Sequence, residues 1–151
     1  MDKREQSEKY ADIGQDLIAT EEILSDIAIS NATIVYLTSE HEKRASGKVV
    51  CAECEKIPDK YKWCIPCDYT ITVFEPNVED FTEEQLRILI LHELMHIKIK
   101  FHDDGTEEYE IRPHDVEEFR DIIDRFGLDW DRCEGKSDMD MLVDALPAFE
   151  I

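Results

Sequence analysis

The sequence predicts an α+β domain in which helices pack on a small sheet. Two observations carry this prediction. Apolar residues recur at helical spacing near the N-terminus and in two later segments, whereas β-branched and aromatic residues fill short stretches between them. No internal repeat or low-complexity tract divides the 151 residues, so we expect one domain over residues 1–151.

Helical and extended patterns alternate along the first half of the chain. Apolar residues at roughly helical intervals predict one or two amphipathic helices over residues 6–29. The stretch "ATIVYLTS" (32–39) is β-branched and aromatic, which is typical of a buried strand. A polar turn precedes Lys48, where a second strand is expected to begin. In "DYTITVFE" (68–75), apolar and polar residues alternate, which predicts a strand with one solvated face.

A helix start is marked by Thr82 and Gln85, which have the spacing of a capping box. The apolar run behind them predicts a helix that continues to about Lys100. After a turn, residues 108–113 are expected to be extended, because the residue before a proline disfavours the helical conformation. A further helix is predicted over 114–127, where a glycine ends it, and a short one in "DMDMLVDAL".

Composition excludes several classes of function. The formal net charge of −20 argues against nucleic-acid binding, since that affinity depends on Lys and Arg neutralising phosphates. No apolar run approaches the length of a membrane span, so no membrane association is expected. The charged N-terminus "MDKREQSEKY" lacks the apolar core of a signal peptide, so we expect a cytoplasmic protein.

The segment "ILHELMHI" carries the clearest chemical signal. On a helix, His92 and His96 lie four residues apart and point the same way, so both imidazoles can bind one metal ion. Glu93 lies about 100° around the axis, where its carboxylate can reach a water on that metal. The alternative, hydrogen-bonded core histidines, would bury three costly polar groups in an apolar helix. The pattern therefore favours zinc, with Glu93 as general base.

The third metal ligand is left open by the spacing. His102 follows His96 by six residues, as in metzincins and in a triad of ribosomal-RNA-processing endoribonucleases. Those families have a glycine where this chain has Ile99, and a continuing helix would turn His102 away from the metal. His114 opens the next predicted helix and is the favoured candidate. Acidic residues remain as further alternatives: Glu107, Glu108 and Glu110.

Taken together, "LHELMHI" and the downstream "IRPHDVEEFRDIIDRFGLDW" resemble the putative phage-type metallopeptidase family. The family pairs an H-E-L-x-H helix with an H-D-V-x-x-F helix, and the resemblance covers roughly residues 32–130. It implies a minimal zincin-like domain, a small sheet packed against an active-site helix. It also implies that His92, Glu93, His96 and His114 occupy the matching positions.

Four cysteines form a second candidate metal site. Cys51 and Cys54 make one C-x2-C pair, and Cys64 and Cys67 make another after nine intervening residues. Two such pairs can supply four thiolates to a tetrahedral zinc ion, so we predict a structural Zn²⁺ that staples a loop over 48–70. An iron site, a redox couple, a disulfide and unbound thiols are the alternatives.

These patterns predict a zinc-dependent metallopeptidase that acts on a peptide or protein substrate. One zinc would serve catalysis at the histidines and one would be structural at the cysteines. The alternatives are a non-catalytic zinc-binding interaction module and, less favoured, a metal-dependent endoribonuclease that uses His92, His96 and His102. The substrate and the oligomeric state leave no signature in the sequence.

Overall fold

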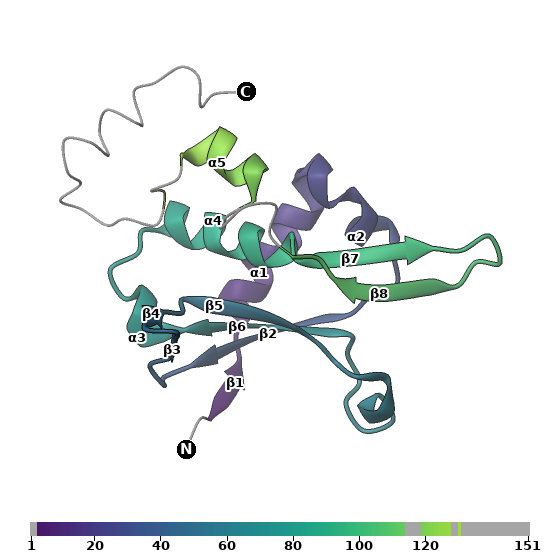
Figure 1. The fold of residues 1–151 in the computed structure, drawn as a ribbon, viewed down its shortest axis with the longest axis horizontal. Helices are drawn as coiled ribbons and strands as arrows, with labels where there is room; N and C mark the ends of the chain where they lie inside the picture. The colour runs from purple at the N-terminus through teal and green to yellow at the C-terminus, as the bar shows by residue number, and fades with distance from the viewer. Residues whose placement is uncertain (1–2, 114–118, 128–129, 131–151) are drawn as a thin grey trace.

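The computed structural model describes residues 3–113, 119–127 and 130 of the chain (Figure 1). The helices are α1 (Glu8–Thr20), η1 (Glu22–Leu24), α2 (Ser25–Ile29), η2 (Asp59–Tyr61), α3 (Glu75–Val78), α4 (Glu83–Leu94) and α5 (Arg120–Phe126), of which η1 and η2 are 3₁₀ turns. The strands are β1 (Arg4–Gln6), β2 (Ile34–Ser39), β3 (Arg44–Ala45), β4 (Lys48–Val49), β5 (Ala52–Lys56), β6 (Tyr69–Phe74), β7 (Ile97–Phe101) and β8 (Glu107–Ile111). The α+β class is therefore confirmed.

The main sheet has four strands in the order β1-β2-β6-β5. The pair β2–β6 is parallel, and the pairs β1–β2 and β5–β6 are antiparallel. The strands expected within 32–39 and 68–75 are confirmed as β2 and β6. The solvated face expected for the second is wrong, because β6 is a central strand and Thr72 is fully buried. Its hydroxyl accepts a 2.9 Å hydrogen bond from the Arg4 guanidinium.

The helices α1, α2, α4 and α5 lie together on one side of the sheet (Figure 1). Packing of α1 against β2 and α4 forms the centre of the core. Large buried side chains from the helices and β6 fill it, among them Tyr10, Leu17, Tyr69, Ile71, Ile90 and Leu94. None of the helices in the described residues is both long and apolar enough to cross a membrane.

Close approach of α1 to β2 depends on Gly14. A Cβ built there would lie 2.2 Å from the hydroxyl oxygen of Tyr36 and 2.3 Å from the ring carbon that bears it. We expect Gly14→Ala to lower the free energy of unfolding by about 1–3 kcal/mol through overpacking. Helix propensity alone would raise the free energy of unfolding by about 1 kcal/mol, so the sign of the measured change separates overpacking from propensity. Urea denaturation measures it, and an equally or more stable variant would contradict this packing.

The helix α4 begins as predicted but ends earlier. Thr82 and Gln85 form both hydrogen bonds of the capping box, which confirms the predicted start. The helix ends at Leu94, not near Lys100, and the next residues form β7. In "IKIKF" the isoleucines are buried while the lysines are exposed, a period of two that a strand satisfies and a helix does not. The histidine pattern therefore spans the end of the helix.

The hairpin β7–β8 follows α4 and confirms the extended segment expected within 108–113. Beyond it, α5 covers the described part of the helix predicted over 114–127. Gly127 follows α5 with a φ of 83°, the left-handed conformation expected of a glycine at that position. The short helix predicted in "DMDMLVDAL" lies outside the described residues.

Candidate metal centre

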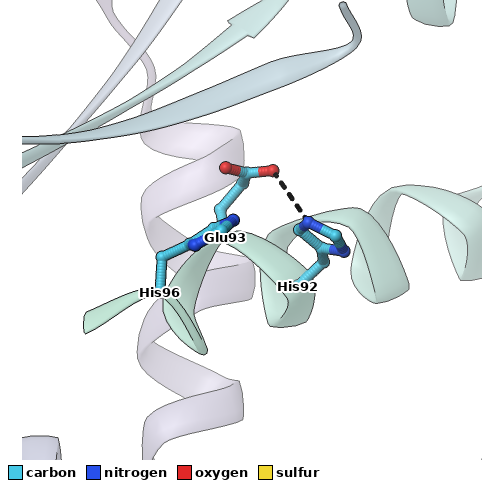
Figure 2. Close-up of side chains that lie close together, drawn as sticks. All are labelled: His92, Glu93 and His96. Carbon is cyan, nitrogen blue, oxygen red and sulfur yellow. Dashed lines mark ion pairs between the residues drawn. The ribbon is translucent and has the colours of Figure 1, made fainter. Parts of the chain in front are cut away.

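The two histidines and the glutamate converge at the C-terminal end of α4 (Figure 2). One ligand atom of each residue lies within 4.8 Å of the others. The distance from His92 Nε2 to Glu93 Oε2 is 3.9 Å, and the Glu93 side chain is 6% exposed. Among the described residues, these three form the one such group of at least three potential metal ligands. The convergence predicted from the sequence is thus present.

A backbone carbonyl orients the His96 imidazole. The distance from His96 Nδ1 to the carbonyl oxygen of Arg112 is 2.8 Å. A carbonyl oxygen can only accept, so Nδ1 carries a proton, and in the neutral ring Nε2 then carries the lone pair. Metal-binding histidines commonly donate their second nitrogen in this way, which fixes the tautomer and the ring. The arrangement suits a metal ligand that binds through Nε2.

An aromatic ring packs against both histidines. The Phe119 ring centroid lies 5.1 Å from that of His92 and 5.0 Å from that of His96, and its side chain is fully buried. The Arg112 guanidinium covers the same ring at 4.8 Å. Phe119 precedes α5, so the second helix of the motif pair reaches the site through this residue. The H-D-V-x-x-F pattern contains Phe119, but nothing in the sequence indicated Arg112.

The described candidates for a third metal ligand lie outside the group formed by His92, Glu93 and His96. His102 lies after β7 in the hairpin turn, where its Nε2 is 3.7 Å from Glu108 and its side chain is 49% exposed. Glu107 accepts a hydrogen bond from the backbone of Asn31, and Glu110 pairs with lysines of β7. None of these side chains belongs to the histidine cluster. His114, the favoured ligand, lies outside the described residues.

The four cysteines do not converge. Cys51 lies beside the last residue of β6, since its carbonyl accepts from Phe74 N at 2.9 Å. Cys67 lies near the opposite end of that strand, where Ile57 N donates to the carbonyl of residue 68 at 2.8 Å. Six residues of strand correspond to about 20 Å. The predicted four-cysteine zinc site is therefore not confirmed, because the β5–β6 register separates Cys51 from Cys67 and no cysteine belongs to a group of potential metal ligands among the described residues.

Cys54 lies inside the domain and close to the metal centre. It pairs with Ile71 across the β5–β6 ladder. Burial, and after it the Glu93 carboxylate, raise the pKa of the Cys54 thiol far above its ordinary value. Burial also raises the pKa of Cys67. Both thiols are therefore protonated in the metal-free chain, and zinc binding there would release their protons.

The donor set at the end of α4 fits a zinc ion. Imidazole and carboxylate donors suit Zn²⁺, and one imidazole is already held in the ligating tautomer. Comparison with protein families matched residues 2–145 to the family described as "Putative phage metallopeptidase". A search of the curated proteins found no match. A search of the solved structures likewise found none.

Proposed function

This chain belongs to the putative phage metallopeptidase family, and on that premise we propose that it is a zinc-dependent peptidase. The family indicates a metal-dependent hydrolase of peptide bonds. The observation that carries the proposal is the convergence of His92, Glu93 and His96, with His96 held through Nδ1. We assign the third ligand position to His114, which heads the downstream motif. The substrate is then a peptide or a protein.

Each residue has a distinct part in the proposed reaction. His92 and His96 hold the metal, and the Arg112 carbonyl keeps the His96 ring in place. When bound, Zn²⁺ supplies Lewis acidity to the scissile carbonyl and lowers the pKa of water. Glu93 takes a proton from the attacking water on a carboxylate oxygen and later delivers it to the leaving amine. Its burial keeps bulk water from competing for that oxygen.

A zincin-like arrangement is part of the proposal. The helix α4, which carries His92 and Glu93 and ends two residues before His96, packs against the edge strand β5 of the main sheet. The buried side of α4 rests on the core through Ile90 and Leu94, which are both fully buried. This packing supports the end of the helix where His92, Glu93 and His96 converge (Figure 2). A catalytic metal site needs such packed support behind its ligands.

Two variants, compared with the wild type, separate the proposal from its alternatives. The chain and its His92→Ala and His96→Ala variants are assayed for zinc content and for cleavage of a fluorogenic peptide library. Zinc and cleavage that both depend on the two histidines support a peptidase. Histidine-dependent zinc without cleavage of any peptide favours a non-catalytic zinc module. The endoribonuclease alternative needs His102, which the structure places in the hairpin turn and outside the cluster.

We expect one zinc ion per chain. Because no cysteine belongs to a group of potential metal ligands among the described residues, we expect Cys64→Ser to leave the zinc stoichiometry unchanged. Elemental analysis of the purified protein gives the stoichiometry, with His96→Ala as the variant that loses zinc. A wild-type chain with two zinc ions, one of them lost in Cys64→Ser, would show that the four cysteines do form a site.

A further inference from the structure

The hairpin β7–β8 continues into the metal centre. Its ladder pairs Lys98 with Glu110 and Ile97 with Ile111. The next pair would join His96 to Arg112, and Arg112 N does donate to the His96 carbonyl at 2.6 Å. The His96 backbone N–H, however, donates to the Glu93 carbonyl at 3.1 Å as α4 ends. It is therefore directed to the helix and not to the hairpin.

The imidazole takes the place of that backbone donor. In the ladder, the Arg112 carbonyl would accept from the backbone N–H of its partner. Here it accepts from His96 Nδ1 instead, at 2.8 Å. The imidazole of His96 thus completes the last hydrogen-bonded pair of the hairpin, between His96 and Arg112. Any shift of the hairpin along or away from α4 would move the acceptor that selects the tautomer of His96.

The hydroxyl group of Tyr69 links the hairpin to the main sheet close to the His96–Arg112 pair. Tyr69 begins β6, and its side chain is fully buried. Its hydroxyl donates to the carbonyl of Glu110 at 2.8 Å and lies 3.3 Å from the carbonyl of Lys98. Lys98 and Glu110 are partners in the ladder, so the hydroxyl contacts both strands at one level. That level lies two pairs from His96 and Arg112.

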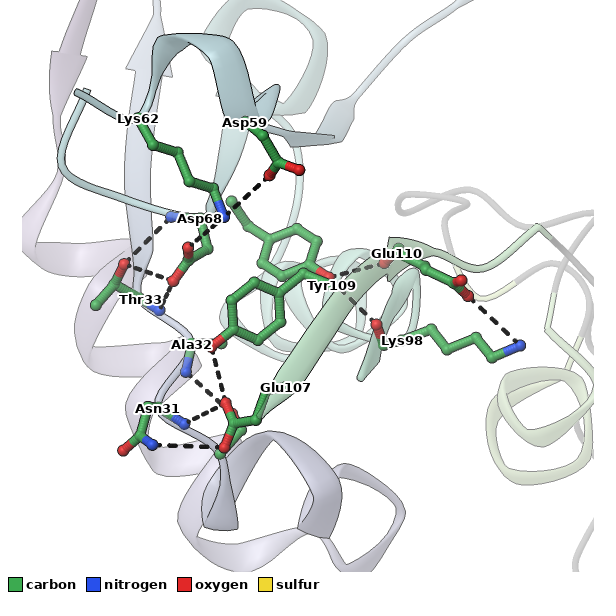
Figure 3. Close-up of polar contacts among 12 residues, drawn as sticks. Asn31, Ala32, Thr33, Asp59, Lys62, Asp68, Lys98, Glu107, Tyr109 and Glu110 are labelled. Atoms are coloured by element: carbon green, nitrogen blue, oxygen red, sulfur yellow. Dashed lines mark hydrogen bonds and ion pairs between the residues drawn. The ribbon is translucent and has the colours of Figure 1, made fainter. Parts of the chain in front are cut away.

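A second tyrosine, Tyr109, is partly buried beside Tyr69 and provides a comparison (Figure 3). Tyr109 lies in β8, and its ring meets that of Tyr69 edge to face at 6.0 Å. Its hydroxyl donates to Glu107 at 2.8 Å, within the same strand and toward the far end of the hairpin from His96. Removing this hydroxyl leaves the link between the hairpin and β6 intact.

We propose that Tyr69 is a positioning residue for the metal centre, acting through the β7–β8 hairpin to hold His96 in the Nδ1–H tautomer. The inference rests on the proposed function only in taking His96 as a ligand. The central strand of the sheet thereby sets the orientation of a metal ligand through the hairpin. Removing the hydroxyl of Tyr69 loosens the hairpin at the level of Lys98 and Glu110. This in turn weakens the hydrogen bond between His96 Nδ1 and the Arg112 carbonyl.

The test compares Tyr69→Phe with Tyr109→Phe, which removes the same atom from the other ring. Zinc affinity is measured by competition with a chromophoric chelator, and the His96 tautomer by long-range ¹H–¹⁵N NMR in the metal-free protein. We expect Tyr69→Phe to weaken zinc binding about tenfold and to reduce the Nδ1–H population of His96. We expect Tyr109→Phe to stay within about twofold of the wild type, below the range of changes at metal-supporting contacts.

Two results would overturn the proposal. One is a Tyr69→Phe variant that keeps both the wild-type zinc affinity and the wild-type tautomer. The other is an Nε2–H tautomer in the wild type itself, which applies even if Tyr69→Phe fails to fold. His96→Ala separates this proposal from the proposed function. If that variant binds zinc as the wild type does, the metal site is wrong; if only Tyr69→Phe is without effect, the positioning role alone is wrong.

Discussion

Glu93→Gln is expected to lower peptide hydrolysis by about 10²- to 10⁴-fold while the zinc content stays near that of the wild type. Glutamine keeps the size of the side chain and its ability to accept a hydrogen bond, but it cannot take a proton from water. Glu93 is 5% exposed, so no other base from solvent easily replaces it. Initial rates on a cleaved peptide, together with zinc analysis of the same sample, measure both quantities.

Glu84→Gln provides the matched control for Glu93→Gln. Glu84 lies in the first turn of the same helix and is exposed, so its loss changes the charge of α4 without touching the metal centre. We expect its activity to stay close to that of the wild type. A Glu93→Gln variant as active as Glu84→Gln would remove Glu93 from the mechanism. A Glu93→Gln variant that loses its zinc would show instead that the carboxylate helps to hold the metal.

His114→Ala is expected to weaken zinc binding by more than about 100-fold, whereas His102→Ala should change it little. Loss of a direct ligand exceeds the 10- to 100-fold effect typical of residues that only support ligands. His102 is exposed in the hairpin turn beside Glu108, so its replacement leaves the centre untouched. Chelator competition on the two variants and the wild type gives the affinities.

The outcome of that comparison also ranks the alternative ligands. If His102→Ala weakens zinc binding more than His114→Ala, the metal site includes the hairpin turn. That result would favour the endoribonuclease-like triad of His92, His96 and His102. If neither variant is affected, an acidic residue completes the site. Each of the three glutamates considered already has a partner: Glu108 lies 3.7 Å from His102, Glu107 accepts from the backbone of Asn31, and Glu110 pairs with Lys100. An acidic ligand among them would have to leave that partner.

Local patterns made much of this protein readable from its sequence. The capping box at Thr82 and Gln85 is a contact between residues three apart, and the structure contains both of its hydrogen bonds. His92, Glu93 and His96 lie within five residues, so the last turn of α4 and the residues directly after it bring them to one place. The strands β2 and β6 are short, β-branched and bounded by polar residues, which marked them in advance.

Contacts between distant residues lay beyond such patterns. The sequence does not reveal that the Arg112 carbonyl meets His96, because a backbone acceptor has no side-chain signature. The end of α4 was misplaced because "IKIKF" fits both an apolar helix and a strand, and only pairing with β8 makes it a strand. Spacing likewise suggested one site for the four cysteines, whereas the ladder between β5 and β6 sets Cys51 and Cys67 about 20 Å apart.

The sequence by itself therefore determined which groups can do chemistry, and tertiary structure decided how they are held. Glu93 and the two histidines are chemically competent on any helix that presents them together. Their protonation and orientation depend on what packs beside them: the carbonyl of Arg112, the ring of Phe119 and, through the hairpin, the hydroxyl of Tyr69. These partners come from other elements, and only the burial of the shared core brings them into contact with the site and the hairpin.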